Sequence, residues 1–163
     1  MRHFRMAVLG AAVMITAAGA AEVPQRLAVL PLELNDTSGE APNPEQERRL
    51  RLLDAELLAR LAASDRYVPV AAALPAGAPS VRNCNRCDVV EAQQVGAGLV
   101  LTGVVHKVSN LILDLTLILR EVPSGTDRGV WRAEFRGNTD ESWQRALSWM
   151  LRNRLLAPPE AAR

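Results

Sequence analysis

The sequence has few of the residues that catalytic and metal-binding chemistry requires. It contains two cysteines, Cys84 and Cys87, and two histidines, His3 and His106. A structural zinc site needs four ligands, mostly cysteine and histidine, so the chain is short of ligands for one. No acid or hydroxyl is tied to His106 by spacing, which leaves a Ser-His-Asp site without support. We therefore expect no metal, no cofactor and no catalytic residue.

The sequence also lacks an excess of either charge. Its formal net charge is +1, and loss of Arg2 and Arg5 with a signal peptide would bring it to −1. Nucleic-acid affinity depends on clustered Lys and Arg that neutralise phosphates, so the composition argues against a nucleic-acid partner.

Long apolar runs are confined to the start. Arg2 and Arg5 precede an apolar run from Met6 to about Ala20, and small residues follow at the A-x-A pattern of a cleavage site. The run is shorter than the roughly 20 residues that span a bilayer, although a retained anchor stays an alternative. We expect a signal peptide at residues 1–20, a single domain at residues 21–163, a periplasmic location and no membrane span after cleavage.

Hydrophobic periodicity predicts five strands and three helices in the order β-α-β-α-β-β-β-α. The strands are expected at residues 26–34 and 66–72 and in the segments "LVLTGVVHKVS", "NLILDLTLILREV" and "VWRAEFR". Helices are expected at residues 44–63, 88–97 and 139–155. Pro31 and Pro69 lack an N–H, which predicts an edge or a bulge at each.

The crossovers and short turns between these elements predict the pairing of the strands. Right-handed crossovers make the first three strands parallel, and tight turns make the last three antiparallel. The fold class is therefore α/β, with a single mixed five-stranded sheet packed by two to three helices. Leu111, Leu113, Leu115, Leu117 and Leu119 are expected on one face.

Several stretches resemble known families. "LAVLPLEL", "LLARLAASDRYVPV", "VGAGLVLTGVV" and a strand pair closed by "PSGT" resemble the N-terminal domain of TolB and the periplasmic domain of CsgG. "HKVSNLILDLTLILREV" and "RGNTDESWQRALSWMLRNRL", with "CNRC" upstream, resemble a secreted proteobacterial domain-of-unknown-function family over nearly the whole mature chain. Genes of that family often lie beside genes for pyrroloquinoline-quinone-dependent alcohol dehydrogenases, which implies a periplasmic accessory role with a quinoprotein or transporter component as partner.

The cysteine pair admits three interpretations. Export favours a structural disulfide between Cys84 and Cys87 that fixes the start of the following helix. Thiol-disulfide exchange is the alternative, because a helix N-terminus lowers the pKa of a thiol. Metal binding is the third, and it is short of ligands.

Polar and small residues are expected to gather where the parallel strands end, the edge at which open α/β sheets bind ligands. The loop with Cys84 and Cys87 is expected to leave the sheet at this edge as well. The candidate binding rim comprises Asn35, Asp36, Lys107, Ser109, Asn110, Arg136, Asn138 and Asp140. A structural interpretation stays open for several of these residues, with Asn138 and Glu141 forming a capping box, Ser109 and Asn110 a hairpin turn, and Asn35 and Asp36 the start of a loop.

These observations favour a non-enzymatic periplasmic interaction module that holds an envelope protein at the rim. A thiol-disulfide oxidoreductase acting through Cys84 and Cys87 is the alternative. A carrier of a small anionic ligand or a metal at the rim, with Lys107 and Arg136 as positive groups, is a third.

Overall fold

The computed structural model of the chain describes residues 23–158. The signal peptide expected at residues 1–20 lies outside this range and stays a prediction, as do the domain limits. Within the described residues, no helix is long and apolar enough to cross a membrane.

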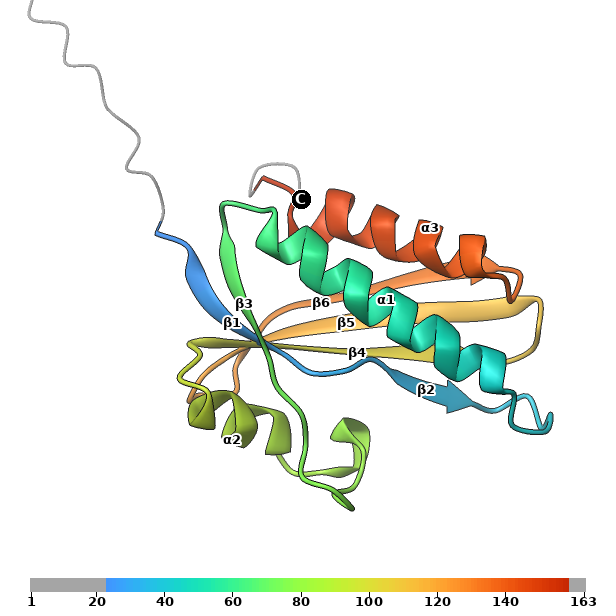
Figure 1. Cartoon of the computed structure of the whole chain (residues 1–163), viewed down its shortest axis with the longest axis horizontal. Coiled ribbons are helices and arrows are strands. Elements are labelled where there is room, and N and C mark those ends of the chain that lie inside the picture. Colours follow the sequence, from blue (N-terminus) through green and yellow to red (C-terminus); the bar gives the residue numbers. More distant parts are fainter. Residues whose placement is uncertain (1–22, 159–163) are drawn as a thin grey trace, which may run out of the picture.

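One open mixed sheet organises the fold (Figure 1). Its order is β3-β1-β4-β5-β6, and β2 pairs with β4 beyond the end of β1. The pairs β1–β3, β1–β4 and β2–β4 are parallel. The pairs β4–β5 and β5–β6 are antiparallel. The strands are β1 (Gln25–Val29), β2 (Glu33–Asp36), β3 (Tyr67–Ala71), β4 (Leu99–Lys107), β5 (Ile112–Glu121) and β6 (Asp127–Arg136). The predicted α/β fold class and strand directions are confirmed.

Pro31 divides the predicted first strand into two. The N–H of Leu30 still donates to the carbonyl of Leu101 in β4, but the N–H of Leu32 turns away to Asp54 Oδ1 at 2.8 Å. Proline has no N–H for the ladder between them, so the sheet has six strands instead of five. Pro69 lies in the edge strand β3, as predicted.

Helices cover the two faces of the sheet unequally (Figure 1). One face carries α1 (Pro44–Ala62) and α3 (Asp140–Met150), and α3 continues as the π-helical turn η2 (Leu151–Leu155). The other face carries the short helices η1 (Val81–Asn83) and α2 (Cys87–Gln94). We call these the α1/α3 face and the disulfide face.

The main core lies under α1 and α3. It unites leucines of both helices with the inward residues of the sheet, and Trp143 is its largest side chain. The predicted leucine row of β5 is buried at Leu113, Leu115, Leu117 and Leu119, but Leu111 precedes the strand and is 58% exposed. A smaller core on the disulfide face is built from Ala28, Leu30, Ala72, Val89, Ala92, Ala97 and Val100.

Candidate functional site

The predicted rim lies at the end of the sheet where β2 and β4 finish and α1 begins. Its centre is Lys107, the only lysine in the chain. The ammonium lies 2.9 Å from Asp36 Oδ2, 3.0 Å from Ser38 Oγ and 2.8 Å from Glu40 Oε2, and Lys107 is 0% exposed. All three donors of the ammonium thus have a protein acceptor, so the side chain is not a free cation for a ligand.

The charges of this cluster hold each other in the ionised state. Burial alone would lower the pKa of Lys107, but hydrogen bonds to Glu40 and Asp36 outweigh it and raise that pKa. The hydroxyl of Ser38 is the largest cause that lowers the pKa of Asp36 to about 2; desolvation opposes it, and Lys107 adds to the lowering. The ion pairs of Lys107 with Asp36 and Glu40, here called the clip, therefore connect the loop after β2 to β4.

A second set of hydrogen bonds fastens the β4–β5 turn. The Asn110 amide donates to both carboxylate oxygens of Glu40, at 2.7 and 2.9 Å. Its carbonyl oxygen accepts from the Asn138 amide at 2.8 Å. Ser109 Oγ accepts from the backbone N–H of Leu111 and of Ile112. The predicted turn role of Ser109 and Asn110 agrees with these bonds.

The start of α3 differs from the prediction. Thr139 is the N-cap, and its hydroxyl accepts from the N–H of Ser142 at 3.2 Å. Asn138 was expected there, but its side-chain oxygen accepts from the indole N–H of Trp143 at 3.0 Å and from Arg49 at 3.2 Å. The predicted capping box is wrong because the buried indole N–H competes for the Asn138 oxygen.

The last rim carboxylate is also neutralised within the chain. Asp140 accepts from Arg48 at 2.7 Å and from Arg49 at 2.8 Å, both on α1. Hydrogen bonds from Arg48 and Arg49 lower the pKa of Asp140, although desolvation opposes them. These two ion pairs connect α1 to α3.

The structure thus joins most predicted rim residues in one continuous network. Asp36, Lys107, Asn110, Asn138 and Asp140 are connected through Glu40 and Arg49. Asn35 lies opposite His106 in the register, and Arg136 lies opposite Ile112 with an exposed side chain. A ligand-binding role for these residues stays a prediction, and their contacts support a structural one.

The same rim presents an apolar surface that the sequence reading missed. Val108, Leu111 and Ile112, here called the apolar turn, are 44%, 58% and 44% exposed. The turn is held on both sides, because Asn110 is bonded to Glu40 and the N–H of Gly137 donates to the Leu111 carbonyl at 3.1 Å. Leucine periodicity placed Leu111 in the core, and the signal that could have corrected it was the Ser109-Asn110 turn directly before it.

A polar set lies on the disulfide face beside the rim. His106 Nδ1 is 3.2 Å from Asp114 Oδ2, and Thr37 Oγ1 is 2.9 Å from His106 Nε2. Arg132 donates to the same Asp114 oxygen at 2.7 Å. This connectivity matches a hydrolase triad, but the Thr37 hydroxyl donates to the Lys107 carbonyl at 3.2 Å. A triad requires the hydroxyl proton to point at the base, so the set supports a structural role.

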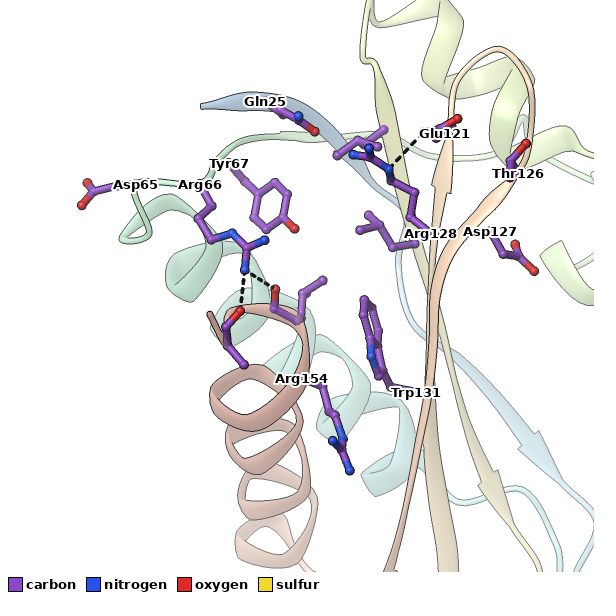
Figure 2. Close-up of a pocket in the computed structure, with 14 residues that line it drawn as sticks. Gln25, Asp65, Arg66, Tyr67, Glu121, Thr126, Asp127, Arg128, Trp131 and Arg154 are labelled. Carbon is purple, nitrogen blue, oxygen red and sulfur yellow. Dashed lines mark hydrogen bonds and ion pairs between the residues drawn. The ribbon is translucent and has the colours of Figure 1, made fainter. Parts of the chain in front are cut away.

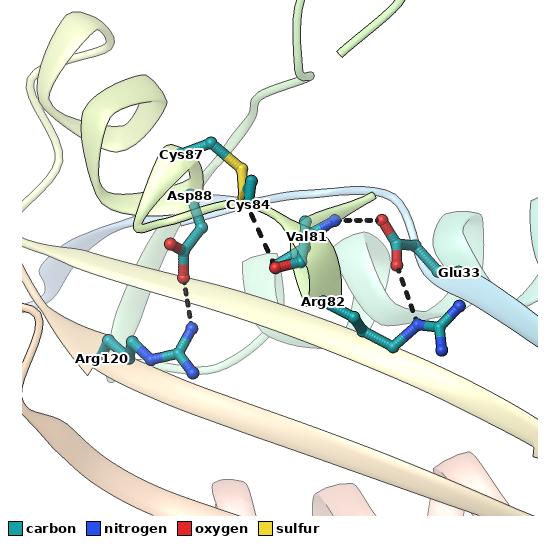
Figure 3. The surroundings of a disulfide bond; sticks show 7 residues. All are labelled: Glu33, Val81, Arg82, Cys84, Cys87, Asp88 and Arg120. Carbon is teal, nitrogen blue, oxygen red and sulfur yellow. Dashed lines mark hydrogen bonds and ion pairs between the residues drawn. A yellow bond between two sulfur atoms is a disulfide. The ribbon is translucent and has the colours of Figure 1, made fainter. Parts of the chain in front are cut away.

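The disulfide lies on the disulfide face of the sheet, near Val81 and Asp88 (Figure 3). Cys84 and Cys87 are bonded, in agreement with the predicted pairing. Their loop packs under the sheet, where Asp88 is paired with Arg120 of β5 and Arg86 donates to the Pro123 carbonyl near the opposite end of the molecule. The expected position of this loop at the rim is wrong. After β3 the chain runs across the disulfide face of the sheet, where it contacts Glu33 of β2 and Arg120 of β5, before and at the start of α2.

A pocket with polar and aromatic lining lies at the end of the molecule opposite the rim (Figure 2). This terminal pocket, about 470 Å³, lies between Tyr67 of β3 and Trp131 of β6, and Leu155 of η2 also lines it. Arg66 is fixed there by the carbonyls of Ala157 and Leu155, at 2.8 and 3.3 Å. The π-helical turn widens the end of α3 beside this pocket, and such turns recur at functional sites.

Comparison with known families places the chain in a family of unknown function. Residues 25–155 match the family model described as a protein of unknown function (DUF2380). The chain belongs to this family. No curated protein matches it.

Solved structures share the fold at low sequence identity. PelC from Paraburkholderia phytofirmans, a dodecamer, is 14% identical with a TM-score of 0.54, covering 83% of this chain and 91% of that one. Lipoprotein GNA1162 from Neisseria meningitidis is 15% identical with a TM-score of 0.50, covering 83% and 99%. TolB from Acinetobacter baumannii is 14% identical with a TM-score of 0.43, covering 76% of this chain and 26% of that one. At these identities, the similarity to PelC and GNA1162 shows the fold alone, and any activity must be argued from the chain's own residues.

Proposed function

We propose that the chain is an exported, non-enzymatic module that binds a protein partner of the cell envelope through the apolar turn. The observation that carries this proposal is the exposure of Val108, Leu111 and Ile112 on a turn whose polar groups are already bonded. Exposed apolar side chains that lie together mark interaction surfaces, and a rigid loop loses little conformational entropy on binding.

The rim network explains why the turn is rigid. The carboxylate of Glu40 bridges Lys107 and Asn110, so the loop after β2 supports the turn from one side. Asn138 supports it from the other side, through Asn110. The turn therefore needs little rearrangement to meet a partner, and the exposed cation of Arg136, opposite Ile112, favours an acidic group beside the apolar contact.

Two features support the envelope setting. The N-terminal residues have the pattern of an export signal, and one of the proteins that share the fold, GNA1162, is a lipoprotein. The family resemblance favours a quinoprotein or transporter component as partner. A hydrolytic alternative has weaker support, because the Thr37 hydroxyl is engaged within the chain. The Cys84–Cys87 disulfide fits both bracing and thiol exchange, which its reduction potential distinguishes.

Photo-crosslinking in cells tests the proposal directly. A photoreactive phenylalanine analogue at position 111 should give one defined adduct with an envelope protein, and Ile112→Asp in the same chain should remove it. The matched control carries the analogue at Val90, which is 50% exposed on α2. Equal adducts at positions 111 and 90, or an adduct that Ile112→Asp does not affect, would overturn the assignment of the turn.

The terminal pocket favours a second candidate function, the holding of a small ligand. Its volume of about 470 Å³ and its aromatic residues, Tyr67 and Trp131, suit a compact molecule with a flat apolar face. Native mass spectrometry of protein purified from its own host would show a bound mass, and Trp131→Ala should abolish it. Protein that carries no additional mass contradicts this second function.

A further inference from the structure

The outer edge of β6 differs from the other free edges of the sheet. β6 is ten residues long, contains no proline and, among residues 23–158, pairs only with β5. The opposite edge strand, β3, has five residues and contains Pro69, and β2 has four residues and follows Pro31. Proteins normally protect edges by shortness and proline, so β6 is the edge that remains competent to pair with another strand.

The sequence of β6 is complementary to itself in the antiparallel register centred on Ala133. When Ala133 lies opposite the Ala133 of a second copy, Arg132 of each copy lies opposite Glu134 of the other. Trp131 then lies opposite Phe135 on the α1/α3 face. The two-fold axis repeats each contact, which produces two opposite-charge pairs and two aromatic pairs, both favourable across strands.

Neighbouring registers lack this agreement. Centring the pair on Arg132 places the two copies of Arg132 opposite each other and brings Arg128 against Arg136. Centring it on Glu134 places two carboxylates together and brings Arg132 against Arg136. Like charges directly opposite are destabilising, so charge disfavours these two registers. Registers centred on Trp131 or Phe135 avoid like charges, but only the one centred on Ala133 also pairs Trp131 with Phe135 twice.

The space beside β6 is suited to such a contact. A groove of about 590 Å³ runs between β6 and α3, and its apolar lining comprises Ala133, Phe135, Ala146 and Trp149. Trp149 is 40% exposed although it is a large apolar side chain. A second copy paired along β6 would bring its own α3 over this groove and cover Trp149.

We propose that two copies of the chain pair antiparallel along β6 with Ala133 on the two-fold axis, forming one continuous sheet. The occupant of this edge is a second copy because the charges and the aromatic residues of β6 match their own reversed order. This surface meets the apolar turn only at Arg136, and the two proposals are tested at different residues, so either can fail without the other.

Cysteine crosslinking tests the register. Directly opposite Cα atoms in an antiparallel pair are about 4.5–5.5 Å apart, within the range that a disulfide bridges. Ala133→Cys should give a covalent dimer under mild oxidation, read on a non-reducing gel with mass spectrometry of the linked peptide. Val130→Cys is the matched control, since its counterpart lies about six residues along the strand, roughly 20 Å away. A covalent dimer at position 130 as abundant as at position 133 would overturn the register.

Sedimentation velocity over a concentration series tests the dimer itself. Wild-type protein should sediment as a dimer, and Glu134→Arg should raise the dissociation constant by about tenfold, because both charge pairs become repulsive. Glu47→Arg makes the same charge change on an exposed position of α1 and should leave the dimer intact. Wild-type protein that stays monomeric throughout the series, or an equal effect of both variants, refutes the proposal even if Ala133→Cys does not fold.

Discussion

Replacement of Lys107 by methionine should destabilise the chain while leaving its fold intact. Methionine keeps the apolar stem but removes the ammonium, and with it the bonds to Asp36, Ser38 and Glu40. We expect Lys107→Met to lower the free energy of unfolding and to leave the far-ultraviolet circular dichroism spectrum unchanged.

The magnitude follows from what each partner does after the change. Loss of one partner of a fully buried ion pair costs about 3–5 kcal/mol, because the remaining charge stays without solvent. Here the side chains of Asp36 and Glu40 are 21% and 46% exposed, so water can replace the ammonium at both. The cost should approach that of lost hydrogen bonds to charged groups, about 2 kcal/mol, which corresponds to a fall in Tm of roughly 6 °C for a domain of this size.

Urea unfolding followed by tryptophan fluorescence measures this difference, with Arg136→Ala as the control at the same rim. Arg136 has an exposed side chain, so its loss should change the free energy of unfolding by less than about 0.5 kcal/mol. The reasoning is refuted if Lys107→Met is as stable as Arg136→Ala. That result would mean that the clip contributes nothing and that Lys107 is retained for another purpose.

Three further outcomes are expected. Asp36 has a folded pKa of about 2 against an ordinary value of 3.8, so its stabilisation of the fold is present above about pH 4 and disappears as the pH falls through 2. Asp36→Asn should flatten this part of the curve of unfolding free energy against pH, measured by urea unfolding at each pH. Joint replacement of Cys84 and Cys87 by serine should lower the free energy of unfolding by about 2 kcal/mol. The native disulfide should have a reduction potential below about −300 mV in a glutathione titration, and a much higher potential would favour thiol exchange. Thr139→Ala should cost about 1 kcal/mol in thermal unfolding, and a neutral result would place the cap elsewhere.

The sheet could be predicted from the sequence because burial on one face imposes a period of two. The alternation of Leu113, Leu115, Leu117 and Leu119 specifies β5, and the polar residues between them specify its exposed side. Pro69 correctly indicated an edge strand. The break at Pro31 was harder to predict, since it depends on Asp54 of α1, which supplies an acceptor for the N–H of Leu32.

The position of the disulfide could not be predicted because it depends on the path of a long loop. Fifteen residues separate β3 from α2, and strand direction determines only where such a loop starts. Its actual path is set by long-range contacts of Val81 with Glu33 and of Asp88 with Arg120. These pairs are 48 and 32 residues apart in the chain, so no local pattern reveals them.

Most residues of the rim were grouped correctly from the sequence, whereas their role in binding stays a prediction. Sequence position brought Asp36, Lys107, Asn110 and Asn138 to one end of the sheet, and their polarity then favoured a binding site. The structure shows that these groups bind one another, because a buried ammonium requires acceptors and a buried indole requires one as well. Because Asp36, Glu40 and Lys107 are paired with one another, we propose that a partner binds the exposed Leu111 beside them.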